Sequence, residues 1–299
     1  MSFRSGFVAV VGRPNVGKST LVNHLVGQKV AIVSDKPQTT RARILAVVNR
    51  PAGQIVLLDT PGIHKPMHRM NQQMVESALS SARQAELVLW LVEVSEAPGP
   101  GERFVREQLR RIGHPVVLAI NKIDSVRKPR ILPAIDAYRR LMDFQEIVPV
   151  SARTGENVDR LAELLLAHLP EGDRLYPEDF LSDQPGRLFV AEIVREQILA
   201  QTREEVPYSV GVVIDSFAET DGLLRIEASV LVERESQKGI LIGRAGQRLK
   251  AIGTAARYQI EAQMGAKAYL GLFVKVQRDW REDPAILESM GLGADRGGR

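Results

Sequence analysis

The stretch Gly12-Arg13-Pro14-Asn15-Val16-Gly17-Lys18-Ser19 constrains the fold more than any other part of the chain. It matches the pattern G-x-x-x-x-G-K-[ST], in which glycines let successive backbone N–H groups converge on phosphate oxygens at the start of a helix. An apolar run at residues 7–11 precedes it, and apolar residues at helical spacing follow it. The stretch therefore predicts a strand, a phosphate-binding loop and a helix.

The polar residues of this stretch suit a nucleotide. Lys18 supplies a compact positive charge to the phosphates, and the Ser19 hydroxyl can bind a magnesium ion that bridges the last two of them. The alternative is a glycine turn that binds nothing, but a turn alone explains neither the lysine nor the serine. We predict that the nucleotide contacts Gly12, Arg13, Pro14, Asn15, Val16, Gly17, Lys18, Ser19 and Thr20.

Composition excludes several classes of protein. The chain of 299 residues is long enough for two domains, and 44% hydrophobic with 25% charged residues is ordinary for a globular protein. Cysteine is absent, which excludes disulfides and thiolate metal sites and favours a cytoplasmic location. The most apolar window, residues 87–92, is too short to span a bilayer, and we expect no signal peptide.

From residue 1 to about 172, apolar runs alternate with helical stretches. This alternation predicts an α/β domain with a mostly parallel sheet and helices on both faces. Ligands of such sheets bind beyond the carboxyl ends of the strands, so motifs at strand ends are candidate sites. We expect a helix at residues 158–169 and strands at residues 7–11, 44–49, 55–59, 87–94, 116–120 and 147–150.

One strand-end motif suits a metal and a terminal phosphate. Asp59-Thr60-Pro61-Gly62 follows the expected strand at residues 55–59. The Asp59 carboxylate can join a magnesium shell, and the Gly62 backbone N–H can reach a terminal phosphate. Taken alone, such a cluster is usually a turn.

Two further strand ends suit the recognition of a base. The Asp124 carboxylate of Asn121-Lys122-Ile123-Asp124 can accept hydrogen bonds from N1–H and the N2 amino group of guanine, whereas adenine has an acceptor at N1. Ser151 and Ala152 follow the next strand, where their backbone N–H groups could donate to the guanine carbonyl. The order of these motifs predicts a guanine nucleotide.

These four motifs, in this order and spacing, resemble those of the Ras-like G domain. The resemblance implies GTP and GDP as ligands and makes Lys18, Thr40 and Gly62 the residues that act on the terminal phosphate. Thr40 then takes the place of the switch threonine that binds magnesium together with Ser19 and Asp59, with Thr39 as the alternative. Ile63 stands where Ras-like proteins carry a water-orienting glutamine, so we expect slow intrinsic hydrolysis.

After residue 172 the pattern changes. Residues 173–186 contain two prolines and little periodicity, which predicts a linker, and residues 187–281 predict a smaller α+β domain. Residues 282–299 form a polar, glycine-rich tail to which we assign no role. In the smaller domain we expect a helix near residues 188–203, strands near 208–218 and 223–234, a helical hairpin at 238–264 and a strand at 269–277.

A Gly-x-x-Gly tetrapeptide lies inside the expected helical hairpin. Such a loop brings backbone close to a nucleic-acid strand, although alone it is a weak motif. Residues 238–281 hold nine Lys and Arg against two acidic residues, while residues 187–237 hold five against ten, which is more uneven than a solvated surface requires. The element order resembles a type II KH domain, and we predict RNA binding by Gly243, Arg244, Ala245, Gly246, Arg248 and Lys250.

The two domains together resemble the Era family of bacterial GTPases over nearly the whole chain. The resemblance implies a cytoplasmic, monomeric factor that binds single-stranded small-subunit ribosomal RNA near its 3′ end and acts in maturation of the small ribosomal subunit. It also implies some peripheral association with the inner face of the cell membrane. By the same resemblance Asn15 would help to hold a potassium ion beside the phosphates, although asparagine also suits a turn.

Two other readings of the sequence stay open. In the first, the chain is a different P-loop enzyme, a kinase or an ATPase, and residues 121–124 are a chance turn. In the second, it is an RNA-binding scaffold that uses GTP as a structural ligand with negligible turnover, a reading that Ile63 favours.

Overall fold

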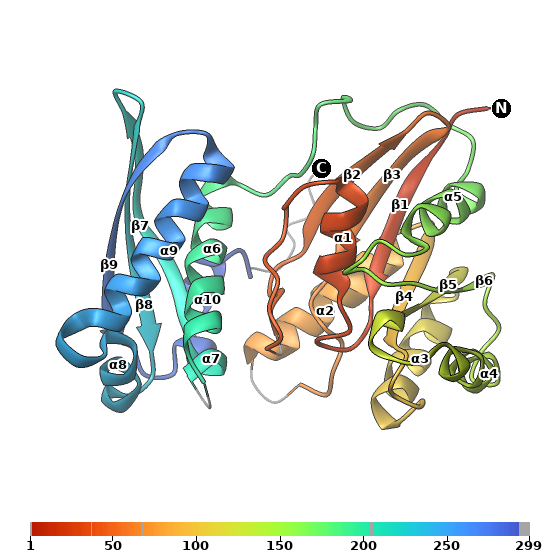
Figure 1. Cartoon of the computed structure of the whole chain (residues 1–299), viewed down its shortest axis with the longest axis horizontal. Coiled ribbons are helices and arrows are strands. Elements are labelled where there is room, and N and C mark those ends of the chain that lie inside the picture. Colours follow the sequence, from red (N-terminus) through yellow and green to blue (C-terminus); the bar gives the residue numbers. More distant parts are fainter. Residues whose placement is uncertain (1, 37, 67–68, 204–205, 293–299) are drawn as a thin grey trace. The chain divides into compact units, whose positions relative to one another are not determined.

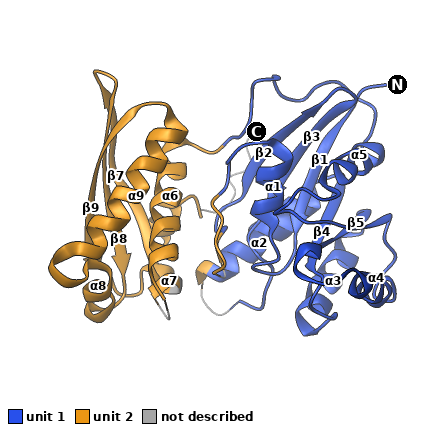
Figure 2. Cartoon of the chain, in the orientation of Figure 1, with its two compact units in different colours: residues 1–31, 40–67, 71–183 blue, residues 32–39, 68–70, 184–299 orange. Residues whose placement is uncertain are grey.

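The apolar run before Gly12 forms β1 (Arg4–Val11), a central strand of a six-stranded sheet (Figure 1). The computed structural model describes residues 2–36, 38–66, 69–203 and 206–292. These divide into two units (Figure 2): one holds the described residues within 1–31, 40–67 and 71–183, and the other those within 32–39, 68–70 and 184–299. No helix in the described ranges is long and apolar enough to cross a membrane.

The six-stranded sheet of the first unit is mostly parallel, as predicted. Its strand order is β2-β3-β1-β4-β5-β6, and only the β2–β3 pair is antiparallel. β1 starts three residues before the expected strand because Arg4, Ser5 and Gly6 pair with residues of β3. The other strands are β2 (Ile44–Arg50), β3 (Gly53–Asp59), β4 (Leu87–Glu93), β5 (Val116–Asn121) and β6 (Glu146–Pro149).

Helices cover both faces of this sheet. α1 (Lys18–Val26) and α5 (Val158–His168) pack on one face, where Val8 and Val10 point from β1. Ala9 and Val11 point to the other face. A strand buried on both sides reads as a continuous apolar run, which is why β1 could be found without alternation. The helices on that second face are α2 (Arg69–Gln84), α3 (Pro100–Ile112) and α4 (Ile131–Arg139).

The segment predicted as a linker lies on the first unit over most of its length. Tyr176 and Phe180 stack with ring centroids 4.9 Å apart and pack on Leu45, Val47, Val56 and Leu58 of β2 and β3. The backbone N–H of Val47 donates to the carbonyl of Leu181 at 2.9 Å. The aromatic pair therefore covers apolar side chains of β2 and β3 that would otherwise face water.

The second unit is the α+β domain that the sequence predicted. α6 (Gly186–Gln201), α8 (Glu235–Ile242) and α9 (Gln247–Met264) share one core with a three-stranded sheet. The first strand begins later than expected because residues 206–209 form the short helix α7 (Val206–Ser209). The sheet order is β7-β8-β9, antiparallel between β7 (Gly211–Thr220) and β8 (Leu223–Val232) and parallel between β8 and β9 (Lys267–Val276).

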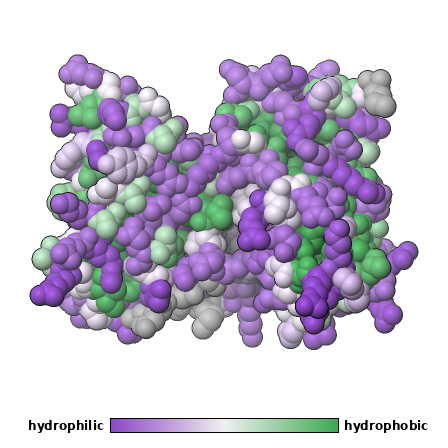
Figure 3. Space-filling model, in the orientation of Figure 1, coloured by the Kyte–Doolittle hydropathy of each residue, from purple (hydrophilic) through white to green (hydrophobic). Residues whose placement is uncertain are grey.

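A short helical segment follows β9. A 3₁₀ turn, Trp280–Glu282, leads into α10 (Pro284–Ser289), and Asp283 caps this helix by accepting from the N–H of Ala285 at 2.9 Å. Trp280 and Leu287 are buried, so part of the expected tail belongs to the folded unit, and residues 293–299 lie outside the described residues. In the view of Figure 3, hydrophilic residues cover most of the surface and hydrophobic residues form separate patches.

Candidate functional site

The glycine-rich loop after β1 is closely packed. Gly12 has φ 153° and Gly17 has φ 97°, values that residues with a side chain rarely adopt. A Cβ at Gly12 would lie 2.3 Å from the carbonyl oxygen of Leu91, and one at Gly17 would lie 2.3 Å from Nδ2 of Asn121. Only glycine fits at these two positions. The loop therefore presents its N–H groups at the start of α1, as a phosphate cradle requires.

Lys18 is buried inside this loop, with 6% of its surface exposed. Its ammonium donates to the carbonyl oxygens of Gly12 at 3.2 Å and Arg13 at 3.0 Å. Burial lowers the pKa of Lys18 to about 8, although the charge of Asp59 acts in the opposite direction. A buried ammonium gains by binding phosphate oxygens, because their negative charge favours its protonated form.

Three oxygen-bearing side chains meet beside Lys18. The Ser19 hydroxyl lies 2.6 Å from the Thr40 hydroxyl and donates to Oδ2 of Asp59 at 2.8 Å, and the Thr40 hydroxyl lies 3.5 Å from the same atom. Oδ1 of Asp59 is buried without a hydrogen-bond partner among the described residues, and burial raises the pKa of Asp59 to about 6. Hydroxyl and carboxylate oxygens, one of them an unsatisfied acceptor, fit the donor set that Mg²⁺ prefers.

The two candidate switch threonines have different contacts. The Thr39 hydroxyl donates to the carbonyl oxygen of Lys36 at 2.7 Å, whereas the Thr40 hydroxyl belongs to the oxygen cluster. This geometry supports the choice of Thr40 as the metal ligand.

The segment after β3 is fastened to the phosphate loop. The Thr60 hydroxyl donates to the carbonyl of Val10 at 2.7 Å, and a Cβ at Gly62 would lie 2.6 Å from the backbone nitrogen of Pro14. The N–H of Ile63 donates to the carbonyl of Gly12 at 3.0 Å, and the Ile63 side chain is fully buried in the core. Gly62 thus lies against the phosphate loop, and the side chain of Ile63 cannot hold a water molecule.

Arg13 and Asn15 are the remaining polar residues of the phosphate loop. Arg13 was predicted to contact the nucleotide, but its guanidinium binds Glu96 at 2.6 Å and Glu102 at 2.9 Å, and only its carbonyl oxygen contacts Lys18. Asn15 adopts a left-handed conformation with φ 66°, which asparagine tolerates better than most residues.

Asn121 joins two loops. Its Nδ2 donates to the carbonyl of Val16 at 2.8 Å, and its Oδ1 accepts from the N–H of Ala152 at 2.9 Å. The neighbouring Lys122 has φ 65° and pairs with Glu93. The carboxyl ends of β5 and β6 are thereby tied to the phosphate loop.

Asp124 is oriented by two donors. The Ser151 hydroxyl donates to one carboxylate oxygen at 2.6 Å, and the Arg153 guanidinium lies 2.5 Å from the other. The hydrogen bond from Ser151 and the charge of Arg153 hold the pKa of Asp124 below its usual value. Each oxygen has a second lone pair, so the carboxylate can still accept two hydrogen bonds from a base. Sequence reasoning missed Arg153, although it directly follows the Ser-Ala motif.

The N–H groups of Ser151 and Ala152 do not point to an open site. The N–H of Ser151 donates to the carbonyl of Glu156 at 3.0 Å, and that of Ala152 donates to Asn121. The expectation that both donate to a guanine carbonyl is therefore not supported in this structure, because each already has an acceptor. The two residues instead shape the loop beside Asp124.

The Gly-x-x-Gly loop of the second unit forms a tight turn between α8 and α9. Gly243 has φ 70°, Ala245 has φ 48° and Gly246 has φ 75°, so three residues of four adopt left-handed or related backbone. Arg244 and Ala245 are exposed. The turn therefore presents backbone and one cation to solvent, as contact with a nucleic-acid strand requires.

The two further cations predicted to bind RNA differ from each other. Lys250 is exposed on α9, whereas one guanidinium nitrogen of Arg248 donates to the carbonyl of Ile240 at 2.6 Å. Arg248 thus also closes the last turn of α8, and only its remaining N–H groups are left to meet phosphates.

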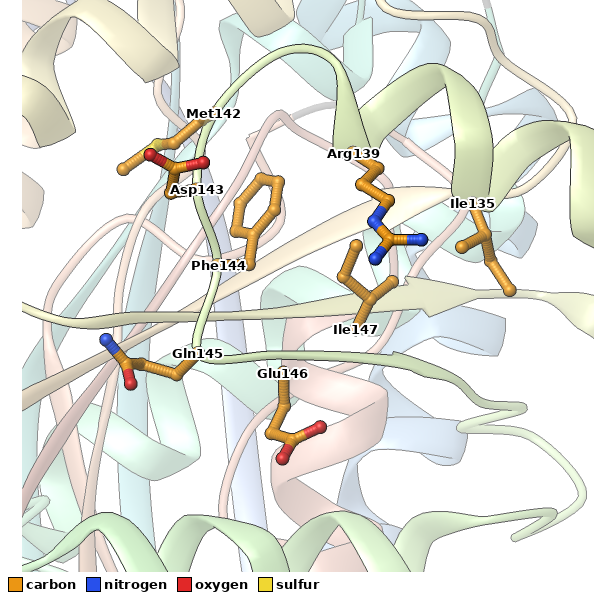
Figure 4. A pocket seen from close by; sticks show the side chains of 8 residues that line it. All are labelled: Ile135, Arg139, Met142, Asp143, Phe144, Gln145, Glu146 and Ile147. Carbon is orange, nitrogen blue, oxygen red and sulfur yellow. The ribbon is translucent and has the colours of Figure 1, made fainter.

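A hollow of about 440 Å³ lies elsewhere on the first unit (Figure 4). It is lined by α4, β6 and the segment between them, and none of the predicted site residues belongs to it. It is separate from the nucleotide site at the carboxyl ends of β1, β3 and β5.

Comparison with known proteins agrees with this division of the chain. The family described as 50S ribosome-binding GTPase matches residues 7–122, and the family described as KH domain matches residues 205–281. GTPase Era of Heliobacterium modesticaldum is 50% identical over 290 residues, covering 97% of each chain. GTPase Era of Geobacter metallireducens is 50% identical over 291 residues, covering 97% of this chain and 98% of that protein.

Two solved structures share the whole fold. One is Era in complex with MgGDPNP and nucleotides 1506–1542 of 16S ribosomal RNA, with a TM-score of 0.94 and 42% identity, covering 98% of this chain and all of that one. The other is a substituted Aquifex aeolicus Era bound to GDP·AlF₄⁻, with the same TM-score, identity and coverage.

Proposed function

The chain belongs to the Era family of GTPases, and we propose that it hydrolyses GTP to GDP and phosphate and binds small-subunit ribosomal RNA near its 3′ end. In this proposal residues 1–172 bind the nucleotide, residues 187–281 bind single-stranded RNA, and residues 173–186 link the two. The protein acts as a monomer in maturation of the small ribosomal subunit. The observation that carries the proposal is the meeting of Ser19, Thr40 and Asp59 beside the phosphate loop.

The residues of the loop bind and polarise the terminal phosphate. Lys18 places its charge on the phosphate oxygens, and the N–H of Gly62 donates to the oxygen that gains charge as the bond to the leaving GDP breaks. Ser19, Thr40 and Asp59 would hold Mg²⁺, which neutralises phosphate charge when bound. Loss of the third phosphate removes the partner of Gly62, so the segment after β3 can respond to the nucleotide state.

The side chain that follows Gly62 cannot orient the attacking water. Ile63 is buried in the core, and water must attack the terminal phosphorus without help from this position. Slow intrinsic turnover and stimulation by a partner follow from this arrangement.

Base selection rests on Asp124. Its ionised carboxylate accepts from N1–H and the N2 amino group of guanine, and Ser151 and Arg153 keep it in place. Adenine offers an acceptor at N1, which the carboxylate repels.

A direct test measures phosphate release from GTP, with and without a 3′ fragment of small-subunit ribosomal RNA, in Mg²⁺. We expect slow release that RNA increases, and competition by GDP but not by ATP. Thr40→Ala should abolish Mg²⁺-dependent release, while Thr39→Ala serves as the matched control because its hydroxyl contacts only backbone. Absence of release under all conditions would favour the scaffold reading, and competition by ATP would favour a different P-loop enzyme.

A potassium ion beside Asn15 is the finer part of the proposal. A monovalent cation there would supply charge that an arginine finger provides in other GTPases. GTP hydrolysis should then be faster in potassium than in sodium at equal ionic strength, and Asn15→Ala should remove the difference. Equal rates in the two salts would leave Asn15 as a turn residue, which its left-handed backbone also explains.

The location of the protein is a further part of the proposal. We place the protein in the cytoplasm with a fraction at the inner face of the cell membrane, and fractionation of cells measures that fraction. Complete recovery in the soluble fraction at low salt would contradict the membrane association.

A further inference from the structure

Basic side chains gather on and beside two helices of the first unit. The acidic residues on these helices are Glu102, which is buried against Arg13, and the exposed Glu107 and Asp136. The basic residues on α3, on α4 and on the residues that flank α4 are called the basic face: Arg103, Arg106, Arg110, Arg111, Arg127, Lys128, Arg130, Arg139 and Arg140.

The cations of the basic face point into solvent. All are exposed except Arg106, which is half-buried. Arg111 lies 3.7 Å from Glu107 on the surface of α3. Within the described ranges no other member forms an ion pair with a carboxylate. The charge of this surface is therefore not neutralised by the protein itself.

The two helices are neighbours. α3 connects β4 to β5 and α4 connects β5 to β6, and these three strands are adjacent in the sheet. Both helices pack on the same face, in one core with Trp90 and Tyr138, and they lie close together in Figure 1. The basic residues that the two helices expose therefore lie on the same side of the sheet.

One side of the basic face is bounded by the hollow of Figure 4. Arg139 lies over this hollow, whose lining includes Ile135 and Phe144 as well as the carboxylates of Asp143 and Glu146. Carboxylates repel phosphate. The surface that attracts a polyanion therefore ends at Arg139.

An anionic lipid surface fits the basic face less well than a nucleic acid does. Stable binding to a membrane needs inserted apolar residues or a lipid anchor in addition to cations. Leu132, 69% exposed, is the single large hydrophobic residue that α3 and α4 expose among the described residues. A phosphate backbone, in contrast, can bind to spaced surface cations that need neither a fixed arrangement nor a pocket.

We propose that the basic face binds the phosphate backbone of ribosomal RNA as a second contact, independent of sequence, in addition to the contact at the Gly-x-x-Gly loop. This inference rests on the proposed RNA-binding function. It adds a surface of the first unit to the RNA-binding surface of the second unit. RNA held at two surfaces binds more tightly than at either alone, because the second contact forms at a high effective concentration.

The test neutralises three cations of α4 and its flanks in the full-length protein. The variant Arg130→Gln/Arg139→Gln/Arg140→Gln changes only exposed side chains that no ion pair holds among the described residues. The control is Arg50→Gln/Arg160→Gln/Arg174→Gln, which removes the same number of charges from β2, α5 and the segment after α5, where Arg50 and Arg174 form surface ion pairs with Asp159 and Glu178. Affinity for a long 3′ fragment of small-subunit ribosomal RNA is measured from 0.05 to 0.3 M salt, with GTP affinity and thermal unfolding as checks on the fold.

We expect the α4 variant to bind the long RNA about tenfold more weakly than the control at low salt. The slope of log affinity against log salt should decrease by roughly 2, since each lost phosphate contact removes about 0.7–0.9 from it. Both variants should bind equally to a short oligonucleotide that fills only the Gly-x-x-Gly loop.

Three outcomes separate the alternatives. If the unaltered protein binds no RNA, the proposed function fails. If it binds RNA and the α4 variant binds as tightly as the control, the inference fails alone. If the α4 variant keeps RNA affinity but loses binding to vesicles of phosphatidylserine, the basic face serves a membrane and the inference is overturned.

Discussion

The two glycine-containing loops of this protein are both built to meet phosphates, yet they are constructed differently. In the loop before α1, both glycines are in van der Waals contact with other parts of the chain, and Lys18 is buried. In the turn between α8 and α9, a Cβ at Gly243 would lie 2.8 Å from the Cβ of Arg248, but one at Gly246 would meet nothing within 4 Å, and Arg244 is exposed. One loop is a closed cradle, and the other is an open surface.

The difference follows from the size of the ligand. A nucleotide is small, so a site that surrounds it can desolvate each phosphate oxygen and supply a fixed donor to it. A strand of RNA is a polymer that continues past the loop, so its site must stay open at both ends. Rigid enclosure gives large effects for single residues, whereas an open surface distributes the binding energy over many.

The largest effect should come from the closed loop. Lys18→Ala or Ser19→Ala should weaken GTP binding by at least about 30-fold, since removing a buried partner of a charged group costs roughly 2–5 kcal/mol. RNA binding in the absence of nucleotide should remain. Calorimetric titration with GTP and with RNA checks both; unchanged GTP affinity in either variant would show that the loop is not the cradle.

Asp124 should give the next largest effect. Asp124→Asn should lower GTP affinity about 10- to 100-fold, because the amide keeps one acceptor oxygen and loses the other, and one charge-assisted hydrogen bond is worth about 1.5–3 kcal/mol. Xanthosine triphosphate should become the preferred ligand, since xanthine has an acceptor where guanine has an amino group. Competition between the two nucleotides measures the shift, and a variant that still prefers GTP would refute base reading by this residue.

The open loop should tolerate change better. Replacing Arg244 and Ala245 by aspartates should weaken RNA binding about tenfold, with a smaller loss at high salt because repulsion is screened. GTP affinity should not change. Fluorescence anisotropy with labelled RNA measures this, and a fragment of residues 1–172 that binds RNA as well as the full chain would contradict it.

Low pH should weaken nucleotide binding and leave RNA binding unchanged. Burial raises the pKa of Asp59 to about 6, so this carboxyl becomes protonated as pH falls through 6 and can no longer bind a cation. Mg²⁺-dependent GTP binding should decrease roughly tenfold for each pH unit below 6, while RNA binding through arginine and lysine should not. Nucleotide titrations from pH 7.5 to 5 are the measurement; a flat profile would mean that Asp59 stays ionised.

The same raised pKa has the opposite sign for stability of the ligand-free protein. The unfolded chain ionises this group near its ordinary pKa of about 3.9, so the folded state is penalised as pH rises from about 4 to 6. Asp59→Asn should flatten that decline in the free energy of unfolding.

The smallest effect is expected at Gly246. Gly246→Ala places a side chain at φ 75° in open space, so it should destabilise by about 1–2 kcal/mol without a clash. Gly17→Ala should destabilise more, because its Cβ would collide with Asn121. Urea denaturation of the two variants ranks them, and equal losses would mean that the first loop is not as tightly packed as its geometry indicates.

Much of the candidate site could be predicted because its residues directly follow strands in the sequence. In a parallel sheet the carboxyl ends of β1, β3 and β5 lie at one edge, so motifs far apart in the chain had to meet there. Apolar runs located the strands of the first sheet, since a strand buried on both faces is apolar throughout, and alternation located those of the second sheet. The element order and glycine pair of the second unit indicated its fold without any long-range information.

The sequence by itself determined which elements form and at which edge the polar motifs gather, because apolar periodicity and glycine positions are local properties of the chain. Only the tertiary structure gave Thr40 and Thr39 different contacts, directed Arg13 to Glu96 and Glu102, and brought Arg153 to Asp124. It also packed α3 and α4, which carry or adjoin the cations of the basic face, on one side of the sheet. These choices depend on which groups meet across long stretches of chain, and hydrogen bonds and ion pairs of that kind leave no pattern in the local sequence.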